Sequence, residues 1–451
     1  MDLISGRRFV LTQGFLYTFG GSEIVTLELA EHLVRHGGEV IVVTHGYSEQ
    51  LAAELAEEAR LLRYTDPDLA DVLAERPIDV AWIHHQLVPD ALLRKPGHTA
   101  FVFEHLSSFH ALEHPFAYRI EQVLADAVLF TSDEAMRAQL ATGLLDDVPG
   151  EKLFVMGNPA PDSFAGLDRD SSDALRRVVI VSNHLPDEVL GAASILARQY
   201  EVEFIGIEQD KGAAPARVSP ETLRSADVVV TIGKTVQYCL VSGTPVYCYD
   251  HFGGPGWLTA ESFDRARSLN FSGRGFATKS AEQIATEITE GFEIGRQIAQ
   301  DRRGGSVESF GLTGRVAHVL ELIGAPSGKP STLDHREVEA HILAQRAFGT
   351  YVVMAFEHAA AHTWWKGEAE AQAEKAAWLE SEVQALSETR SVLEARVAEL
   401  DLHVGDLEKR NHALAVRGDE LAEDLKGFLS RLVELEQENA ELRSAHSQDD
   451  D

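Results

Sequence analysis

The sequence predicts an α/β protein with two doubly wound, Rossmann-like domains, followed by a long C-terminal helix that forms a parallel coiled coil. Two observations predict this fold class. Short apolar runs alternate with amphipathic helical patterns in two successive stretches of the chain. Leucine then recurs every seven residues through the last quarter. These patterns divide the chain into an N-terminal domain at 1–165, a second domain at 175–325, an amphipathic helical connector at 332–366 and a coiled coil at 367–446.

The first stretch opens with a buried strand at 8–12, a helix at 22–36 and a second strand at 39–44. Strand, helix and strand within about 35 residues form a βαβ unit, so the sheet should be parallel. Further strands are expected at 79–84, 99–103, 127–131 and 152–156. The polar segment 166–174, rich in Gly, Ser and Asp, is interpreted as a linker.

The same alternation restarts after the linker. Strands are expected at 177–182, 202–206, 227–232 and 245–249, and closing helices at 281–299 and 309–323. The segment PSGKP at 326–330 separates this domain from the tail. Open α/β sheets bind ligands at the carboxyl ends of their strands, so two such domains in tandem predict a binding cleft between them.

The tail carries ten successive apolar d positions, which are Leu379, Leu386, Leu393, Leu400, Leu407, Leu414, Leu421, Phe428, Leu435 and Leu442. Several a positions hold Val or Asn, and this combination with Leu at d favours two parallel strands. The sequence therefore predicts a homodimer. The alternative, a single solvated helix, would expose a leucine stripe about 95 Å long at about 1.5 Å per residue.

Composition excludes several classes of protein. The net charge of −32 disfavours nucleic acid as a partner, because an acidic surface repels phosphates. The two cysteines, Cys239 and Cys248, lack the spacing of a zinc site. Neither a signal peptide nor an 18-residue apolar run is visible, so a cytoplasmic protein is predicted. The aromatic-ended segment 348–365 leaves open a peripheral contact at the inner membrane face, although such segments more often pack on their own domain or at a dimer interface.

The first strand and helix are joined by a loop that contains Gly20 and Gly21. Paired glycines let a ligand approach the backbone, and amides at a helix N-terminus favour an anion or a sugar hydroxyl. The alternative is a tight connection without a ligand. The segment GGSEIVTLELAEHLVRHGGEVIVVT, which starts at this pair, resembles the opening motif of retaining glycosyltransferases with the GT-B fold, especially family four. Segments 125–140, 154–164 and 219–256 resemble later parts of that family in order.

The resemblance covers roughly residues 8–324. It implies a nucleotide-sugar donor on the second domain, a glycan or other hydroxyl acceptor on the first, retention of configuration, and no metal or cofactor. The donor-binding segment is atypical for the family. Asn183 and His184 stand where an Arg and a Lys usually hold the pyrophosphate, and Tyr238 and Gly256 replace two family glutamates.

Two glycine-containing turns could compensate for these replacements. Gly233, Lys234 and Thr235 end a predicted strand and open a helix, so the lysine, the hydroxyl and the helix amides could bind a diphosphate. Gly253 and Gly254 could bring the backbone close to a sugar. The alternatives are an exposed lysine beside a cap and an ordinary turn.

Four polar residues fall at the carboxyl ends of two first-domain strands, namely His84, His85, Glu104 and His105. We predict that Glu104 and His105 are catalytic and that the other two line the acceptor side together with the loop glycines Gly20 and Gly21. By the resemblance, His105 matches a histidine near the donor sugar and could orient a hydroxyl. Buried histidines with purely structural hydrogen bonds are the alternative. Glycosyl transfer in glycan or surface-polysaccharide synthesis is the predicted function; a non-catalytic dimeric scaffold and a sugar-nucleotide epimerase are the alternatives.

Overall fold

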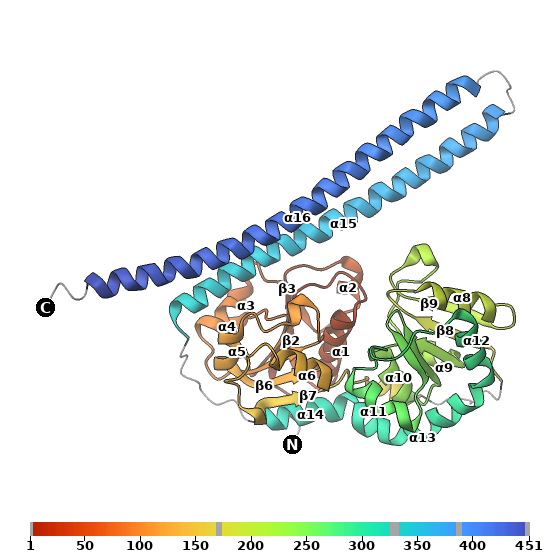
Figure 1. Cartoon of the computed structure of the whole chain (residues 1–451). Helices are drawn as coiled ribbons and strands as arrows, with labels where there is room; N and C mark the ends of the chain where they lie inside the picture. Colours follow the sequence, from red (N-terminus) through yellow and green to blue (C-terminus); the bar gives the residue numbers. More distant parts are fainter. Residues whose placement is uncertain (1–2, 168–173, 325–332, 385–389, 447–451) are drawn as a thin grey trace. The chain divides into compact units, whose positions relative to one another are not determined.

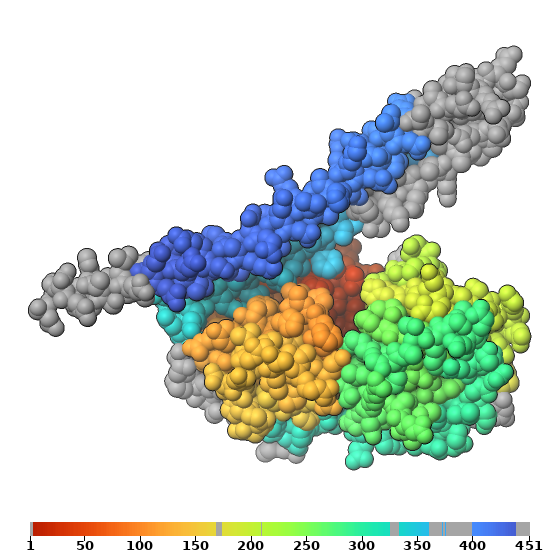
Figure 2. Space-filling view, viewed as in Figure 1, coloured from red at the N-terminus to blue at the C-terminus, as the bar shows by residue number. Residues whose placement is uncertain are grey.

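The structure is a computed structural model, and it describes residues 3–167, 174–324, 333–384 and 390–446. The chain divides into two compact units, Met1–His358 and Ala359–Asp451. The first unit holds both α/β domains (Figure 1). In Figure 2 these domains form two lobes that meet along a seam.

The N-terminal domain is built on a seven-stranded parallel sheet in the order β3-β2-β1-β4-β5-β6-β7. Its strands are β1 (Arg8–Gln13), β2 (Glu39–Thr44), β3 (Arg60–Arg63), β4 (Val80–His84), β5 (Ala100–His105), β6 (Ala125–Phe130) and β7 (Leu153–Val155). The central strands are apolar along most of their length because both faces of the sheet are covered. Its helices are α1 (Gly21–Arg35), α2 (Glu49–Ala53), α3 (Leu69–Ala74), α4 (Asp90–Arg94), α5 (Tyr118–Leu124), α6 (Asp133–Leu140) and α7 (Asp162–Ala165).

The second domain contains a five-stranded sheet in the order β12-β11-β10-β8-β9. Its strands are β8 (Arg177–Val181), β9 (Glu201–Ile205), β10 (Val228–Thr231), β11 (Val246–Asp250) and β12 (Gly253–Trp257). All neighbours are parallel except β11 and β12. Its helices are α8 (Asp187–Leu196), α9 (Pro220–Ser225), α10 (Lys234–Ser242), α11 (Ala260–Ser268), α12 (Ala281–Glu290) and α13 (Phe292–Phe310). The predicted α/β class with two Rossmann-like domains is confirmed.

Local boundaries differ from the prediction in three places. Gly291 separates α12 from α13, where one helix was expected at 281–299. The helix predicted at 309–323 begins later, at Leu312, because Gly311 has extended backbone. The segment expected to be a glycine loop forms the edge strand β12. Sequence patterning missed β3 as well, since its four residues RLLR carry no period-two alternation.

The last helix before the tail, α14 (Leu312–Ile323), packs on the N-terminal domain rather than on the second. Four of its residues belong to the core of the first sheet, namely Leu312, Val316, Val319 and Leu320. The chain therefore crosses twice between the domains. The two crossings pair with each other, because the amide of Ala160 donates to Phe310 and its carbonyl accepts from Leu312, at 2.7 and 2.8 Å.

The first part of α15 (His335–Gln384) is also built into the N-terminal domain. Val338 and Ile342 are buried in its core, and the ring of Phe356 stacks on Tyr17 at 4.1 Å between centroids. The predicted connector thus packs on its own domain over its described contacts, the more frequent role expected for an apolar helix of this kind. No helix in the described part of the chain is long and apolar enough to cross a membrane.

The second unit contains the end of α15 and α16 (Arg390–His446). Six of its predicted d residues have exposed side chains in the single chain, namely Leu400, Leu407, Leu414, Leu421, Phe428 and Leu435. Leu386 lies outside the described residues. The dimeric coiled coil stays a prediction.

Candidate functional site

A cavity of about 210 Å³ lies between the two domains. Its second-domain wall is formed at the carboxyl ends of β8, β9, β10 and β11, where a parallel sheet presents its loops. Its first-domain wall comes from the glycine loop and the first turn of α1, through Phe19, Gly21 and Ile24. Both predicted donor-side residues after β8, Asn183 and His184, line this cavity, as do Lys234 and Thr235.

The floor of the cavity is polar around Asp250. Its carboxylate accepts hydrogen bonds from the Ser182 hydroxyl and the His251 amide, each at 2.9 Å. Burial raises the pKa of Asp250 to about 6. The rings of His184 and His251 meet edge to face at 5.1 Å. This end of the cavity therefore gains negative charge as the pH rises through 6.

Lys234 begins α10, directly after Gly233, whose positive φ of 65° suits glycine. The Lys234 ammonium lies 2.8 Å from a carboxylate oxygen of Glu28 on α1 and donates to the Pro159 carbonyl at 3.0 Å. Lys234, the side chain predicted to bind the diphosphate, is thus paired with a carboxylate of the N-terminal domain in this structure. The turn is at the cavity, as predicted, but its cation already has an anionic partner.

Glu28 also interacts with two other side chains of the second domain. The Tyr238 hydroxyl donates to it, and Arg217 lies 3.5 Å away. Arg217 also forms a two-point ion pair with Glu31. We call Glu28, Glu31, Lys234, Tyr238 and Arg217 the interdomain ionic cluster. Its central carboxylate, that of Glu28, is 1% exposed and is therefore shielded from water. Sequence reasoning identified Lys234 and Tyr238 but missed Arg217, Glu28 and Glu31.

The glycine hairpin has a structural explanation. A side chain at Gly254 would overlap the Cys248 carbonyl on the neighbouring strand, and one at Gly253 would press on Ala277. Neither glycine lines the 210 Å³ cavity. The hairpin therefore needs both glycines for its own packing, and their predicted contact with a sugar remains untested.

The acceptor-side glycine loop differs between its two glycines. Gly20 is the N-cap of α1, and a side chain there would press against the carboxylate of Glu23. Gly21 has no neighbour within 4 Å of an added Cβ and faces the cavity. The Glu23 carboxylate is held by the hydroxyls of Thr18 and Ser22 at 3.0 and 2.8 Å. Of the two glycines, Gly21 is therefore the one that borders the open space of the cavity.

His84 and Glu104 form a buried pair at the ends of β4 and β5. The Nε2 atom of His84 lies 3.2 Å from Glu104, which also accepts a hydrogen bond from Trp82 at 2.6 Å. The Nδ1 atom of His84 contacts the Thr26 hydroxyl on α1 at 3.0 Å. Glu104 further borders a very small cavity shared with Glu28 and Lys234. Glu104 thus lies beside the interdomain ionic cluster.

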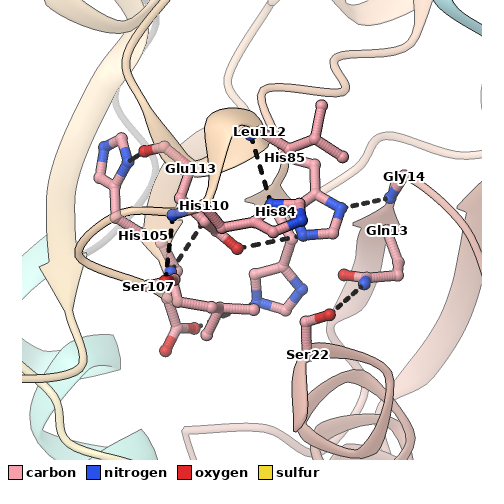
Figure 3. Close-up of polar contacts among 12 residues, drawn as sticks. Gln13, Gly14, Ser22, His84, His85, His105, Ser107, His110, Leu112 and Glu113 are labelled. Carbon is pink, nitrogen blue, oxygen red and sulfur yellow. Dashed lines mark hydrogen bonds and ion pairs between the residues drawn. The ribbon is translucent and has the colours of Figure 1, made fainter. Parts of the chain in front are cut away.

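The ring of His105 points toward Glu113 on the segment after β5 (Figure 3). Its ring nitrogens contact the Glu113 carbonyl and the Glu121 carboxylate, the latter at 2.9 Å. Burial alone would lower the pKa of His105, but these oxygens outweigh it and the pKa is raised. The two predicted catalytic residues are therefore brought to one edge of the sheet but enter different hydrogen-bond networks.

His85 has a positive φ of 50° and is held on both ring nitrogens. Its Nδ1 atom accepts from the Gly14 amide at 3.2 Å, and Nε2 lies 3.0 Å from Glu113. The exposed ring of His110 stacks over it at 6.4 Å between centroids (Figure 3). His110, on the loop after β5, is a titratable group that the sequence analysis did not single out. No group of three or more His, Cys, Asp or Glu side chains in the described residues could hold a metal ion.

One comparison with known proteins concerns the N-terminal domain. Residues 19–164 match the family model of Glycosyltransferase Family 4, and this match covers most of the N-terminal domain. The predicted recognition of a GT-B-type glycosyltransferase is confirmed at this level. None of the curated proteins is a significant match to the chain.

Several solved structures are similar in fold. A glycosyltransferase from Rickettsia africae ESF-5 has 14% identity and a TM-score of 0.47, over 70% of this chain and 98% of that one. A putative UDP-N-acetylglucosamine 2-epimerase from Listeria monocytogenes has 14% identity and a TM-score of 0.44, over 70% and 95%. MurG from Acinetobacter baumannii has 10% identity and a TM-score of 0.41, over 70% and 99%.

Proposed function

We propose that this glycosyltransferase transfers a sugar from a nucleotide-sugar donor, bound in the 210 Å³ cavity, to a hydroxyl of a glycan or related acceptor. One observation carries the assignment. The glycine loop of the family 4 domain and the carboxyl ends of four second-domain strands line the same cavity. A donor placed there contacts both domains, and enclosure between them excludes water that would hydrolyse it.

The donor diphosphate is assigned to the turn at Gly233, Lys234 and Thr235. The α10 amides and the lysine supply positive charge at the cavity wall. When the sugar leaves, negative charge grows on the diphosphate, and fixed positive groups stabilise it. Donor binding in this scheme exchanges the Glu28 carboxylate for a phosphate as the partner of Lys234.

The acceptor is assigned to the carboxyl edge of the first sheet, near Gly21 and His110. Glu104 is retained as the candidate that orients the reacting groups, because it borders the interdomain ionic cluster. His105 is better assigned to positioning the loop after β5, since both of its nitrogens are bonded inside the domain. Retention of configuration, metal independence and a cytoplasmic location are proposed on the family resemblance.

A non-catalytic scaffold is the second candidate, and one observation favours it. Glu28 and Glu31 neutralise Lys234 and Arg217, the two cations at the cavity. A protein that no longer bound a diphosphate could keep such ion pairs as a fixed link between its domains. The epimerase alternative is weaker, because Glu104 and His105 enter separate networks and offer no acid–base pair.

Calorimetric titration with UDP-, GDP- and dTDP-sugars separates the two candidates. We expect the wild type to bind one donor class and Lys234→Ala to lose that binding about tenfold or more, the effect of about 1.4 kcal/mol. Lys211→Ala is the matched control, since this lysine lies in the second domain and pairs with Glu208 outside the cavity lining. A wild type that binds none of the donors would favour the scaffold.

A further inference from the structure

A second cavity, of about 420 Å³, lies beside the two crossings between the domains. We call it the hinge cavity. It shares no lining residue with the donor cavity. Its first-domain wall comes from the loop after β6 and from β7, and its second-domain wall from α11 and the end of α13. The cavity therefore lies where any change in the angle between the domains would alter its width.

The chain around the hinge cavity is fixed by amide side chains from both domains. The Asn158 amide group donates to Asn270 at 3.0 Å, and its backbone amide donates to Gln237 at 3.1 Å. Asn270 and Phe271 both have positive φ, 55° and 51°. The surrounding structure holds two consecutive residues in this uncommon conformation, which makes the wall of the cavity well defined.

Two arginines face the hinge cavity from opposite domains. Arg315, on α14, packs with the first domain, donates from Nε to the Met156 carbonyl at 3.0 Å and covers the ring of Phe154 at 4.5 Å. Arg267, on α11, covers the ring of Phe310 at 5.5 Å. Neither forms an ion pair with an acid anywhere in the described part of the chain.

The charges of Arg315 and Arg267 affect each other. Burial and the charge of Arg267 both lower the pKa of Arg315, which means that the two guanidinium groups repel each other. Two acids, Asp133 and Asp264, also line the cavity, and their side chains are exposed, as is that of Arg267. The hydroxyl residues Thr131, Ser268 and Ser309 complete the polar lining.

We propose that the hinge cavity binds a phosphate-bearing anion between Arg267 and Arg315. Guanidinium groups form paired, charge-assisted hydrogen bonds with phosphate oxygens, and an anion between two like charges removes their repulsion. The rings of Phe154 and Phe310 lie against these guanidinium groups, and Arg315 is also anchored because its Nε and Nη2 atoms donate to the carbonyls of Met156 and Val155. Because each arginine belongs to a different domain, a bound anion would link the domains and bias the opening of the donor cavity.

Inorganic pyrophosphate is the probe, titrated by calorimetry into full-length protein that carries Lys234→Ala to weaken the donor site. We expect one remaining binding site. Adding Arg267→Gln should weaken it about tenfold, the loss of a charge-assisted pair worth about 1.4 kcal/mol. Arg315→Lys should weaken it less, since the charge stays and the forked geometry is lost. Arg224→Gln removes the same charge from an exposed position on α9 and should leave pyrophosphate affinity unchanged.

The proposal is overturned if the Lys234→Ala protein binds no pyrophosphate, or if Arg267→Gln and Arg224→Gln give equal affinities. Arg267 has an exposed side chain, so its replacement should leave the fold intact, and an unchanged unfolding temperature checks this. The proposal does not depend on the proposed function. Loss of nucleotide-sugar binding in Lys234→Ala tests the donor cavity, whereas loss of pyrophosphate in Arg267→Gln tests the hinge cavity.

Discussion

The buried carboxylate of Glu28 holds three side chains of the second domain against the first. Lys234, Tyr238 and Arg217 all lie on its oxygens, and water cannot replace a lost partner at a side chain that is 1% exposed. Removing one member of a buried charged cluster is costly because the remaining charges stay buried without compensation.

We therefore expect Glu28→Gln to lower the free energy of unfolding by about 3 kcal/mol. Glu31→Gln is the matched control on the same helix. Glu31 pairs with Arg217 but is 25% exposed, so its loss should cost about 1 kcal/mol or less. Urea unfolding of both variants measures the difference. Equal, small losses in the two variants would show that the interdomain ionic cluster contributes little to stability.

At the residue scale, the sequence predicted some of these side chains but not their partners. The turn at Lys234 could be predicted, because glycine, a cation and a hydroxyl follow a strand pattern. Its partner could not, since Glu28 lies 206 positions earlier on a helix whose pattern shows only that it is amphipathic. The acids that hold His85 and His105 could not be predicted for the same reason, because they come from a 3₁₀ turn and a short helix after β5.

At the scale of elements, the first part of α15 packs on the N-terminal domain through close backbone contact. Gly349 faces His45, and a side chain at this position would overlap the imidazole. Gln345 adds hydrogen bonds to His45 and to the Gln86 carbonyl, at 3.1 and 2.9 Å. The sequence predicted a helix here. It could not predict the contact, because the helical pattern does not distinguish Gly349 from a glycine that faces solvent.

We expect Gly349→Ala to lower the free energy of unfolding by about 1–3 kcal/mol, because the overlap outweighs the gain in helix propensity. Gly314→Ala is the matched control. Gly314 lies inside α14 with no atom within 4 Å of an added Cβ, so this change should raise stability by about 0.5–1 kcal/mol. Thermal unfolding distinguishes the two signs. A stabilising Gly349→Ala would contradict the described packing of α15.

The same contact should depend on pH through His45 and His341. Burial lowers the pKa of each to about 4, and each has one ring nitrogen without a hydrogen-bond partner in the described structure. Their pKa values lie below the unfolded value of about 6.5, so the folded state favours neutral rings. That contribution is complete above pH 6.5 and is lost as the pH falls towards 4.

Between pH 7 and pH 5 we expect each histidine to remove up to about 2 kcal/mol from the free energy of unfolding. Chemical unfolding at both pH values measures the total. The double variant His45→Gln, His341→Gln should have a smaller pH dependence than the wild type. An unchanged pH dependence would show that these side chains do not respond as buried neutral histidines.

At the scale of the whole molecule, the heptad repeat predicts a second copy of the chain. The d residues of α16 from Leu400 to Leu435 are 45–65% exposed in the single chain, and a parallel partner would cover them. We expect the full-length protein to sediment as a dimer. Replacing Leu407 and Leu414 by Glu should give monomers that keep wild-type donor affinity. A monomeric wild type would contradict the coiled-coil assignment.

Fold class followed from the sequence because alternating buried strands and helices leave a strong pattern in each domain. The packing of the helices between the domains could not be predicted. Helix α14 returns to the first domain through Leu312 and Val316, and no local sequence pattern indicates which of two sheets a helix will cover. Both cavities lie at the junction of the two domains that these crossings connect.

The central claim is that a nucleotide sugar binds between the domains, in contact with both. Hydrogen–deuterium exchange with and without the selected donor nucleotide tests it most directly. We predict slower exchange in two separate segments, 19–24 in the glycine loop and α1, and 231–238 in the turn and α10, with little change in α16. Protection confined to one domain, or no protection at saturating nucleotide, would contradict the account.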